Sequence, residues 1–246
     1  MALKASPDDQ AHLLELQAID TKLQQLDHRA KTVPEIAVLA GLASEADTLR
    51  GERLSANGAV EDARLELGRV ESDVAVVEAR ISRDSARLQG SSSVKDVAGL
   101  ESELAGLRKR QSDLEEIELT VMERLEALEA TLRATDEKLA ELESRIAGTT
   151  TERDVALAAI AGERSHAAAN RSTIASTLPD DLLALYERQR GRYGFGASLL
   201  QGGVSLASGV KLNESDMQLV RAAAPDDVLL CPDSNAILVR TNESGL

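Results

Sequence analysis

The stretch QGSSSVKDVAG, residues 89–99, separates two long apolar repeats of this chain. It gathers serines between two glycines, a composition typical of a connection rather than of a helix interior. Ser93 or Asp96 is a suitable N-cap for a helix that follows. The stretch decides the fold because one repeat runs up to it and the other begins directly after it.

The two repeats are long enough to predict a coiled coil. From Leu42 to Leu88 and from Leu100 to Ile146, the repeat positions are spaced alternately by four and three residues. Twelve of fourteen positions are apolar in the first repeat and eleven of fourteen in the second. A surface helix rarely sustains such a pattern over nearly seven heptads, so the pattern favours a coiled-coil seam. The polar exceptions are Arg53, Asp84, Gln111, Glu118 and Thr135.

The repeats are mirror images of each other. The numbers of facing positions always add up to 188, as for Leu88 with Leu100 and Leu42 with Ile146. Reversed order with one constant sum is what a chain folded back on a single turn produces. We therefore predict an antiparallel hairpin whose arms of about 50 residues are roughly 75 Å long. A parallel homodimer is the competing explanation, and oligomerisation of the hairpin is a further alternative.

Composition and charge narrow the class of protein. The aromatic residues are Tyr186, Tyr193 and Phe195, too few for an ordinary core of this size. The formal net charge of −14 works against non-specific binding to nucleic acid or to anionic membranes. A lone cysteine excludes an internal disulfide, the polar start MALKASPDDQ does not resemble a signal peptide, and no apolar run could span a membrane. We expect a cytoplasmic protein.

We expect two domains, residues 1–178 and 179–246. The first is the helical hairpin, with its turn near 89–98. Pro34 should interrupt the N-terminal helix, and the weak helix formers of AGTTTERD, residues 147–154, suggest a matching bend near 148–152. After residue 178 glycines accumulate and short β-type runs appear, VLLC at 228–231 and AILVRT at 236–241. The expected fold class is mainly α, with a small C-terminal β-containing domain after a short helix.

Three segments give the chain a family resemblance over nearly its whole length. They are SSSVKDVAGLESELAGLRKRQSDLEE at the turn, LPDDLLALYERQR, and the C-terminal LNESDMQLVRAAAPDDVLLCPDSNAILVRT. The chain resembles bacterial proteins in which a coiled-coil hairpin precedes a four-cysteine zinc ribbon. Members of that family are described as nucleic-acid-binding candidates, and some relatives resemble adaptors that engage RNA or an alternative sigma factor.

The resemblance places the four zinc ligands of the family at Ser205, Ser208, Cys231 and Ser234. Three of the four are serines, whose neutral hydroxyls are poor substitutes for the thiolates that hold zinc. The histidines lie in the helical segments and cannot complete the site. We therefore expect a degenerate ribbon with no metal and no cofactor. No base accompanies Cys231, so we also expect no catalytic residue.

The segment YERQRGRYGFG, residues 186–196, contains the candidate contact residues. Arginines beside aromatic rings suit phosphate contact and base stacking. The competing interpretation is that the aromatic residues pack the small domain while the arginines are solvated. Residues 180–246 hold six basic and nine acidic residues, which favours that interpretation. The candidates are Arg188, Arg190, Arg192, Tyr193 and Phe195.

The sequence favours a protein that is not an enzyme, because it contains no phosphate-binding glycine loop and no catalytic triad pattern. We expect an adaptor that binds a protein partner through the hairpin and the ribbon-like domain. The alternative is a regulatory protein that binds RNA or DNA through its C-terminal domain and the segment from Arg188 to Phe195. A third hypothesis is a structural spacer that forms homo-oligomers.

Overall fold

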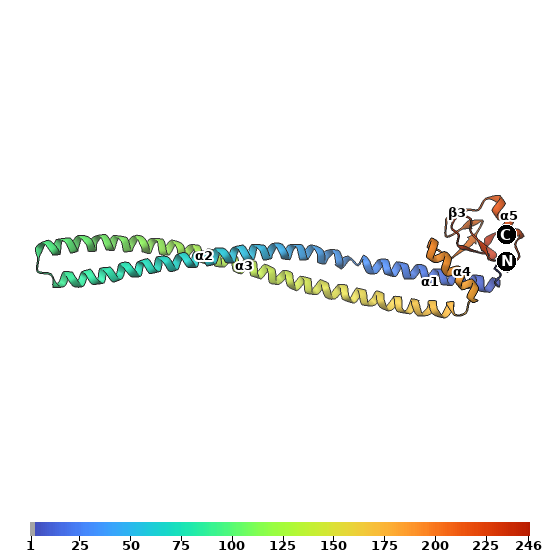
Figure 1. Cartoon of the computed structure of the whole chain (residues 1–246), viewed down its shortest axis with the longest axis horizontal. Coiled ribbons are helices and arrows are strands. Elements are labelled where there is room, and N and C mark those ends of the chain that lie inside the picture. Colours follow the sequence, from blue (N-terminus) through green and yellow to red (C-terminus); the bar gives the residue numbers. More distant parts are fainter. Residues whose placement is uncertain (1–2) are drawn as a thin grey trace. The chain divides into compact units, whose positions relative to one another are not determined.

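The computed structural model describes residues 3–246 and is mainly helical (Figure 1). The helices are α1 (Pro7–Lys31), α2 (Pro34–Gly90), α3 (Val94–Ala175), α4 (Asp180–Tyr193), α5 (Glu214–Ala222) and the 3₁₀ turn η1 (Asn242–Ser244). The strands are β1 (Ala197–Gln201), β2 (Val204–Ser205), β3 (Val210–Lys211), β4 (Leu229–Leu230) and β5 (Ile237–Val239). The chain forms two compact units, one of Met1–Pro34 with Glu152–Leu246 and one of Glu35–Thr151. None of the described helices is both long and apolar enough to span a membrane.

The unit Glu35–Thr151 is an antiparallel helical hairpin, as the repeats predict. Within it α2 and the first part of α3 run side by side in opposite directions (Figure 1). Between them the Ser93 hydroxyl accepts a hydrogen bond from the Asp96 backbone N–H at 3.4 Å, so Ser93 caps α3. Apart from Arg53, every predicted repeat position is buried or half-buried. The two repeats are therefore the seam along which the arms pack.

The register of the arms also follows the sequence. Leu42 packs in one buried cluster with Leu142 and Ile146 near the open end of the hairpin. Further along, Arg53 donates to Asp136, which directly follows the predicted facing residue. These contacts fix the intramolecular pairing in the register that the mirrored repeats require.

The predicted break at Pro34 is present. Helix α1 ends at Lys31 and α2 begins at Pro34, where a missing N–H costs the helix nothing. The other arm behaves differently, because α3 continues without interruption through residues 148–152. A bend in α3 at that level stays a prediction.

The other unit contains a five-stranded sheet in the order β3-β2-β1-β5-β4. The apolar runs of the sequence form β4 and β5, which pair antiparallel with Leu230 opposite Ile237. Strands β1 and β5 pair in parallel, with Ala197 opposite Ile237. All three residues of β5 are fully buried, as is typical of a strand that is covered on both faces.

Helices cover both faces of this sheet. Ile237 and Val239 share a core with residues of α1 and α4, including Leu13, Leu182 and Tyr186. The intervening Leu238 packs instead with residues of α5. The compact units divide the chain after Pro34 and after Thr151, and the boundary expected at 178/179 stays a prediction. The first turns of α1 pack on β1 and β5, and the end of α3 adds Ile174 and Ala175 to the same core, so both belong to the unit of the sheet.

The N-terminal residues extend this packing. The Ala5 N–H donates to the Asp226 carbonyl at 2.9 Å, and the Val228 N–H donates to the Leu3 carbonyl at 3.0 Å. Lys4 lies opposite Asp227 in an isolated β-bridge. The start of the chain is thus bound to a segment more than 200 residues away, which no local pattern in the sequence indicates.

Candidate functional site

Asp20 of α1 is the centre of a buried polar cluster that is not among the predicted sites. Its side chain is almost completely buried. From α3, Arg171 donates Nε to Oδ1 at 2.6 Å and Nη2 to Oδ2 at 3.1 Å. From α4, the Tyr186 hydroxyl donates to Oδ2 at 2.7 Å, and Arg190 Nη1 lies 3.4 Å from Oδ1. One carboxylate therefore ties three helices together.

The charges of this cluster are balanced. Glu187 accepts from Arg171 and from Arg190, the latter at 3.1 and 3.0 Å. Burial and the hydrogen bond to Asp20 raise the pKa of Tyr186 far above its ordinary value. The hydrogen bond to Asp20 likewise raises the pKa of Arg171, against the opposing effect of burial. Both groups hold their protons tightly, so the arrangement suits a structural clamp better than proton transfer.

Gln17, one turn before Asp20, positions the start of β1. Its Oε1 accepts the backbone N–H of Gly196 at 2.7 Å and of Ala197 at 3.3 Å. Gly196 has no room for a side chain, because a Cβ would lie 2.4 Å from the ring of Tyr186. The side chains of α1 thereby fix both the end of α4 and the strand that follows it.

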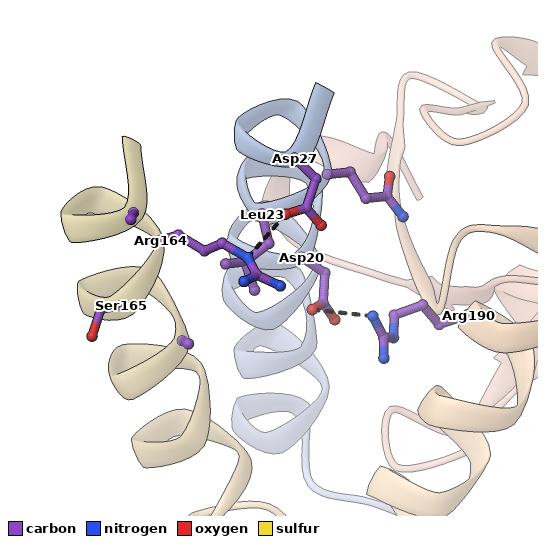
Figure 2. A pocket seen from close by; sticks show the side chains of 9 residues that line it. Asp20, Leu23, Asp27, Arg164, Ser165 and Arg190 are labelled. Carbon is purple, nitrogen blue, oxygen red and sulfur yellow. Dashed lines mark ion pairs between the residues drawn. The ribbon is translucent and has the colours of Figure 1, made fainter. Parts of the chain in front are cut away.

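A cavity of about 440 Å³ lies beside this cluster, between α1 and α3 (Figure 2). Figure 2 shows Arg164 reaching from α3 to pair with Asp27 of α1, while Arg190 pairs with Asp20; the Arg164–Asp27 distance is 2.9 Å. The charged groups that line the cavity are thus two acid–arginine pairs. This neutral lining does not select a ligand of either charge.

The exposed end of α4 consists of Arg188, Arg192, Tyr193 and Phe195, four of the five candidate contact residues. Tyr193 is 45% exposed and Phe195 40%. The guanidinium of Arg192 lies over the Tyr193 ring, 5.9 Å from its centre. The fifth candidate, Arg190, pairs with Asp20 and Glu187 and belongs to the buried cluster.

Helix periodicity explains this division. Leu182, Tyr186 and Gln189 form the buried face of α4, while Arg188 and Arg192, four residues apart, share an exposed one. The competing interpretation, that the aromatic residues pack the small domain, therefore holds for Tyr186 but not for Tyr193 and Phe195. Gly194, with φ of 89°, ends the helix in a left-handed conformation and turns the chain towards β1.

The four positions that correspond to zinc ligands in the resemblance lie in two turns of the sheet domain. Ser205 and Cys231 are buried, whereas Ser208 and Ser234 are half-buried. Across residues 3–246, no three His, Cys, Asp or Glu side chains gather into a group that could hold a metal ion.

One sequence signal could have indicated the Asp20 cluster. Gln10, Gln17 and Asp20 recur on a face of α1 that also carries Leu13 and Leu16, and all five residues are buried. Polar residues on an apolar helical face require buried partners. For Gln17 and Asp20 the partners in the C-terminal half follow more than 150 residues later, so the sequence alone could not name them.

Comparisons with known proteins agree with this architecture. Residues 16–194 match the family model described as "CT398-like coiled coil hairpin domain". A protein of Mycobacterium tuberculosis of uncharacterised function is 34% identical over 239 residues, covering 97% of this chain and 98% of its own length. A protein of Mycobacterium leprae, also uncharacterised, is 24% identical over 220 residues, with 89% and 95% covered.

Solved structures share the fold over most of the chain. A protein from Mycobacterium smegmatis has a TM-score of 0.89 and 33% identity, covering 97% of this chain and all of that one. CT398 from Chlamydia trachomatis has a TM-score of 0.67 at 18% identity, with 94% and 97% covered. The likeness to CT398 bears on the fold alone.

Proposed function

The chain belongs to the CT398-like coiled-coil hairpin family, and from this premise we propose that it is a non-enzymatic adaptor for a macromolecular partner. In this proposal the hairpin provides the main binding surface and the C-terminal domain a second contact. The partner is a protein that presents a basic amphipathic helix.

A groove along one side of the hairpin carries the proposal. We call it the acidic groove; its cavity measures about 470 Å³. Ile117, one of its lining residues, is 44% exposed because it lies outside the seam. Asp113, one turn before Ile117, and the adjacent Glu116 are exposed, and within residues 3–246 neither of these acids forms an ion pair. The acidic groove is lined by Glu66, Asp113, Glu116, Ile117, Thr120, Val121 and Arg124.

The charge distribution supports a basic partner. The hairpin unit, residues 35–151, has 25 acidic and 15 basic residues, so it carries 10 of the 14 net negative charges. Residues 111–130 alone contain seven acidic residues and one arginine. A surface of this sign attracts basic segments and repels nucleic acid.

The arrangement of the groove favours a helical partner segment. An apolar side chain of the partner would cover Ile117, and neighbouring lysine or arginine side chains of the partner would reach Asp113, one turn before Ile117, and the adjacent Glu116. An amphipathic helix provides this combination, because residues three and four apart share one face. A flat basic surface could reach the acids but would leave Ile117 uncovered.

The experiment compares the parent protein with a charge-reversed groove, Asp113→Lys with Glu116→Lys. Proteins would be crosslinked in cells of the source organism, recovered on each chain and identified, and their basic helical segments tested as synthetic peptides by titration. We expect the groove variant to lose its partner and to bind the matching peptide at least tenfold more weakly, because two attractive contacts become repulsive.

The matched control is Glu137→Lys with Glu141→Lys. These acids are also exposed on α3 but lie outside the acidic groove. The control changes the net charge by the same amount and should retain the partner. Equal loss from both variants would mean that only overall charge matters, and equal retention would exclude the groove as the binding site.

The exposed end of α4 favours a second candidate function, binding of single-stranded nucleic acid. Two unpaired arginines and two half-exposed rings at one helix end suit phosphate contact and base stacking. We rank this function second because acidic residues outnumber basic ones in residues 180–246.

A salt-dependent titration with a fluorescent single-stranded RNA tests this second function. Replacing Arg188 and Arg192 by Ala should weaken binding and reduce the slope of log affinity against log salt by roughly one unit per lost phosphate contact. Arg221→Ala is the control, because Arg221 already pairs with Glu214 at 3.1 Å. No binding by the parent protein, or equal slopes in all three proteins, would eliminate this function.

A further inference from the structure

Two turns of the C-terminal domain have the same local geometry. In the first, which follows β2, the Gly209 N–H donates to the Ser205 carbonyl at 2.8 Å. In the second, which follows β4, the Asn235 N–H donates to the Cys231 carbonyl at 2.9 Å. Each turn therefore closes through a backbone bond from its fifth residue to its first.

The fifth residue of each turn has a left-handed backbone. Gly209 has φ of 68°, and Asn235, the only described residue other than glycine with positive φ, has φ of 56°. Asparagine adopts this conformation more readily than other side chains, so it can stand where a glycine is usual. The second turn thus keeps its shape without a glycine.

The fourth residue of each turn is a serine whose hydroxyl accepts a backbone hydrogen bond from two residues later. The Ser208 hydroxyl accepts the Val210 N–H at 3.2 Å, and the Ser234 hydroxyl accepts the Ala236 N–H at 3.4 Å. In both turns the acceptor is the side-chain atom that would be a thiolate sulfur if the residue were cysteine. The two turns are therefore equivalent in backbone closure, in handedness and in the hydrogen bond to the fourth side chain.

The side chains between the turns form a buried cluster. Cys231 is 1% exposed and Ser205 is fully buried. Burial raises the pKa of the Cys231 thiol, but the nearby hydroxyls of Ser205 and Ser234 and the backbone N–H groups of Ser234 and Asp233 outweigh it, so the net pKa is lowered. Cys231 also packs in one buried core with Leu200, the cross-strand partner of Ser205, so the first residues of the two turns lie near each other.

A neighbouring serine completes the cluster. Ser198 Oγ of β1 lies 2.9 Å from Ser205 Oγ and accepts the Ala207 N–H at 2.9 Å. The hydroxyl of Ser205 is thus bonded to the adjacent strand as well as close to the thiol. The hydroxyl–thiol cluster consists of Ser198, Ser205, Cys231 and Ser234.

The donor atoms of this cluster do not fit a structural zinc ion. Zinc sites of four residues use thiolates and imidazoles, and their stability depends on ligands that lose a proton on binding. Here one thiol faces neutral hydroxyls, which keep their protons and bind zinc weakly. The backbone geometry of the turns is therefore compatible with a metal site, whereas the chemistry of their side chains is not.

We propose that the two turns retain the backbone of a four-ligand metal site while the hydroxyl–thiol cluster joins them without metal. The backbone of each turn is held by its own hydrogen bonds, so the domain folds in the absence of zinc. Cysteine at Ser205, Ser208 and Ser234 then suffices to create a tetrahedral zinc site with Cys231.

The first test uses the parent protein. Elemental analysis after purification with added ZnCl₂, followed by gel filtration, should find well under one zinc per ten chains. The thermal midpoint should be unchanged by EDTA. One zinc per chain, or a midpoint that EDTA lowers, would overturn the proposal.

The second test is the triple variant Ser205→Cys, Ser208→Cys and Ser234→Cys. We expect one zinc per chain, and with Co²⁺ in its place the visible absorption bands of a tetrahedral thiolate site. The control adds three cysteines at Ser165, Ser176 and Ser215, which are exposed and do not converge, and it should show no such bands. A folded triple variant without stoichiometric metal would contradict the retained geometry.

A single substitution tests the cluster even if the triple variant does not fold. Ser205→Ala removes a buried hydroxyl that has a partner on β1, and it should lower the thermal midpoint by roughly 3–6 °C. Ser208→Ala removes a half-buried hydroxyl outside the cluster and should lower it by less. Equal midpoints for the two variants would show that the cluster does not join the turns.

Discussion

At the residue scale, the absence of a side chain at Gly196 is a condition for the packing of the C-terminal unit. The ring of Tyr186, fully buried among α1, α4 and the sheet, lies directly over this position. The same close approach lets Gln17 reach the Gly196 N–H. One missing Cβ thus permits both the aromatic core and the hydrogen bond that holds β1.

Gly196→Ala should destabilise the protein by about 1–3 kcal/mol, because the added methyl overlaps the Tyr186 ring. Gly191→Ala is the matched control, since its Cβ would meet no atom within 4 Å. Gly191 lies inside α4, where alanine is the better helix former, so this change should stabilise by about 0.5–1 kcal/mol. Urea unfolding distinguishes the two, and a shift of the same sign in both would refute the account of Gly196.

Tyr186 should make stability depend on pH in the alkaline range. Its pKa in the folded protein is raised above the ordinary value of 10.0, so below pH 10 its contribution to stability is complete. As the pH rises further, the unfolded chain loses the tyrosine proton first. The free energy of unfolding should then fall by up to about 1.4 kcal/mol per pH unit for this proton. Denaturant titrations from pH 9 to 11.5 should give Tyr186→Phe a shallower slope than the parent, and identical slopes would count against the buried phenol.

At the element scale, the hairpin is specified by its seam, and Asp84 is the main exception within that seam. Its side chain is 3% exposed, and its Oδ2 accepts no hydrogen bond, although Arg80 Nε forms a long ion pair with it at 4.0 Å. Its other oxygen accepts from Arg87 at 3.3 Å. A charge buried in a coiled-coil seam costs stability, although it can help to fix the register.

Asp84→Leu should therefore stabilise the hairpin by about 1–3 kcal/mol, because it replaces a poorly compensated charge with an apolar seam residue. Asp62→Leu, an exposed position on the same helix, should change stability by less than about 0.5 kcal/mol. Helix content followed by circular dichroism during urea unfolding gives both values. Destabilisation by Asp84→Leu would mean that Asp84 makes a net favourable contribution.

At the scale of the whole molecule, the chain consists of two units that share the helix α3. The described residues form four buried apolar clusters. Three of them lie entirely within the unit of Met1–Pro34 and Glu152–Leu246, and the fourth lies within Glu35–Thr151. Val33 already packs against Ile160 where the two units are connected. The unit that contains the sheet thus has its own core, and a short link could join its two segments between Pro34 and Glu152.

A shortened chain, in which a Gly-Ser-Gly-Ser link replaces residues 35–151, should fold with the sheet intact. Its amide NMR spectrum should be well dispersed, and Asp20→Asn should destabilise it by roughly 3 kcal/mol, because it removes the buried carboxylate that pairs with Arg171 and Arg190. Asp27→Asn, which breaks an exposed pair, should cost less than about 1 kcal/mol. An unfolded shortened chain would show that the hairpin arms are required for this unit.

The hairpin could be predicted from sequence in detail, whereas the candidate site could be predicted only in part. Repeat spacing gives the seam, and mirrored numbering gives the register, because neighbouring turns of a helix obey a fixed period. The sequence predicts the exposed residues at the end of α4 as one group of contact residues, but it wrongly includes Arg190 in that group. Only its distance from Asp20, in a helix 170 residues earlier, assigns Arg190 to the buried cluster.

The sequence by itself determined the two arms, a turn near 89–98, the break at Pro34 and the apolar runs that form β4 and β5, since each depends on local periodicity or on a local backbone restriction. Only the tertiary structure decided that α1 packs on the C-terminal sheet, and that Asp20 joins Arg171, Tyr186 and Arg190. It also decided that the turns at Ser205 and Cys231 are equivalent. These features depend on contacts between residues far apart in the chain, and no local pattern records which distant partner a buried polar group will find.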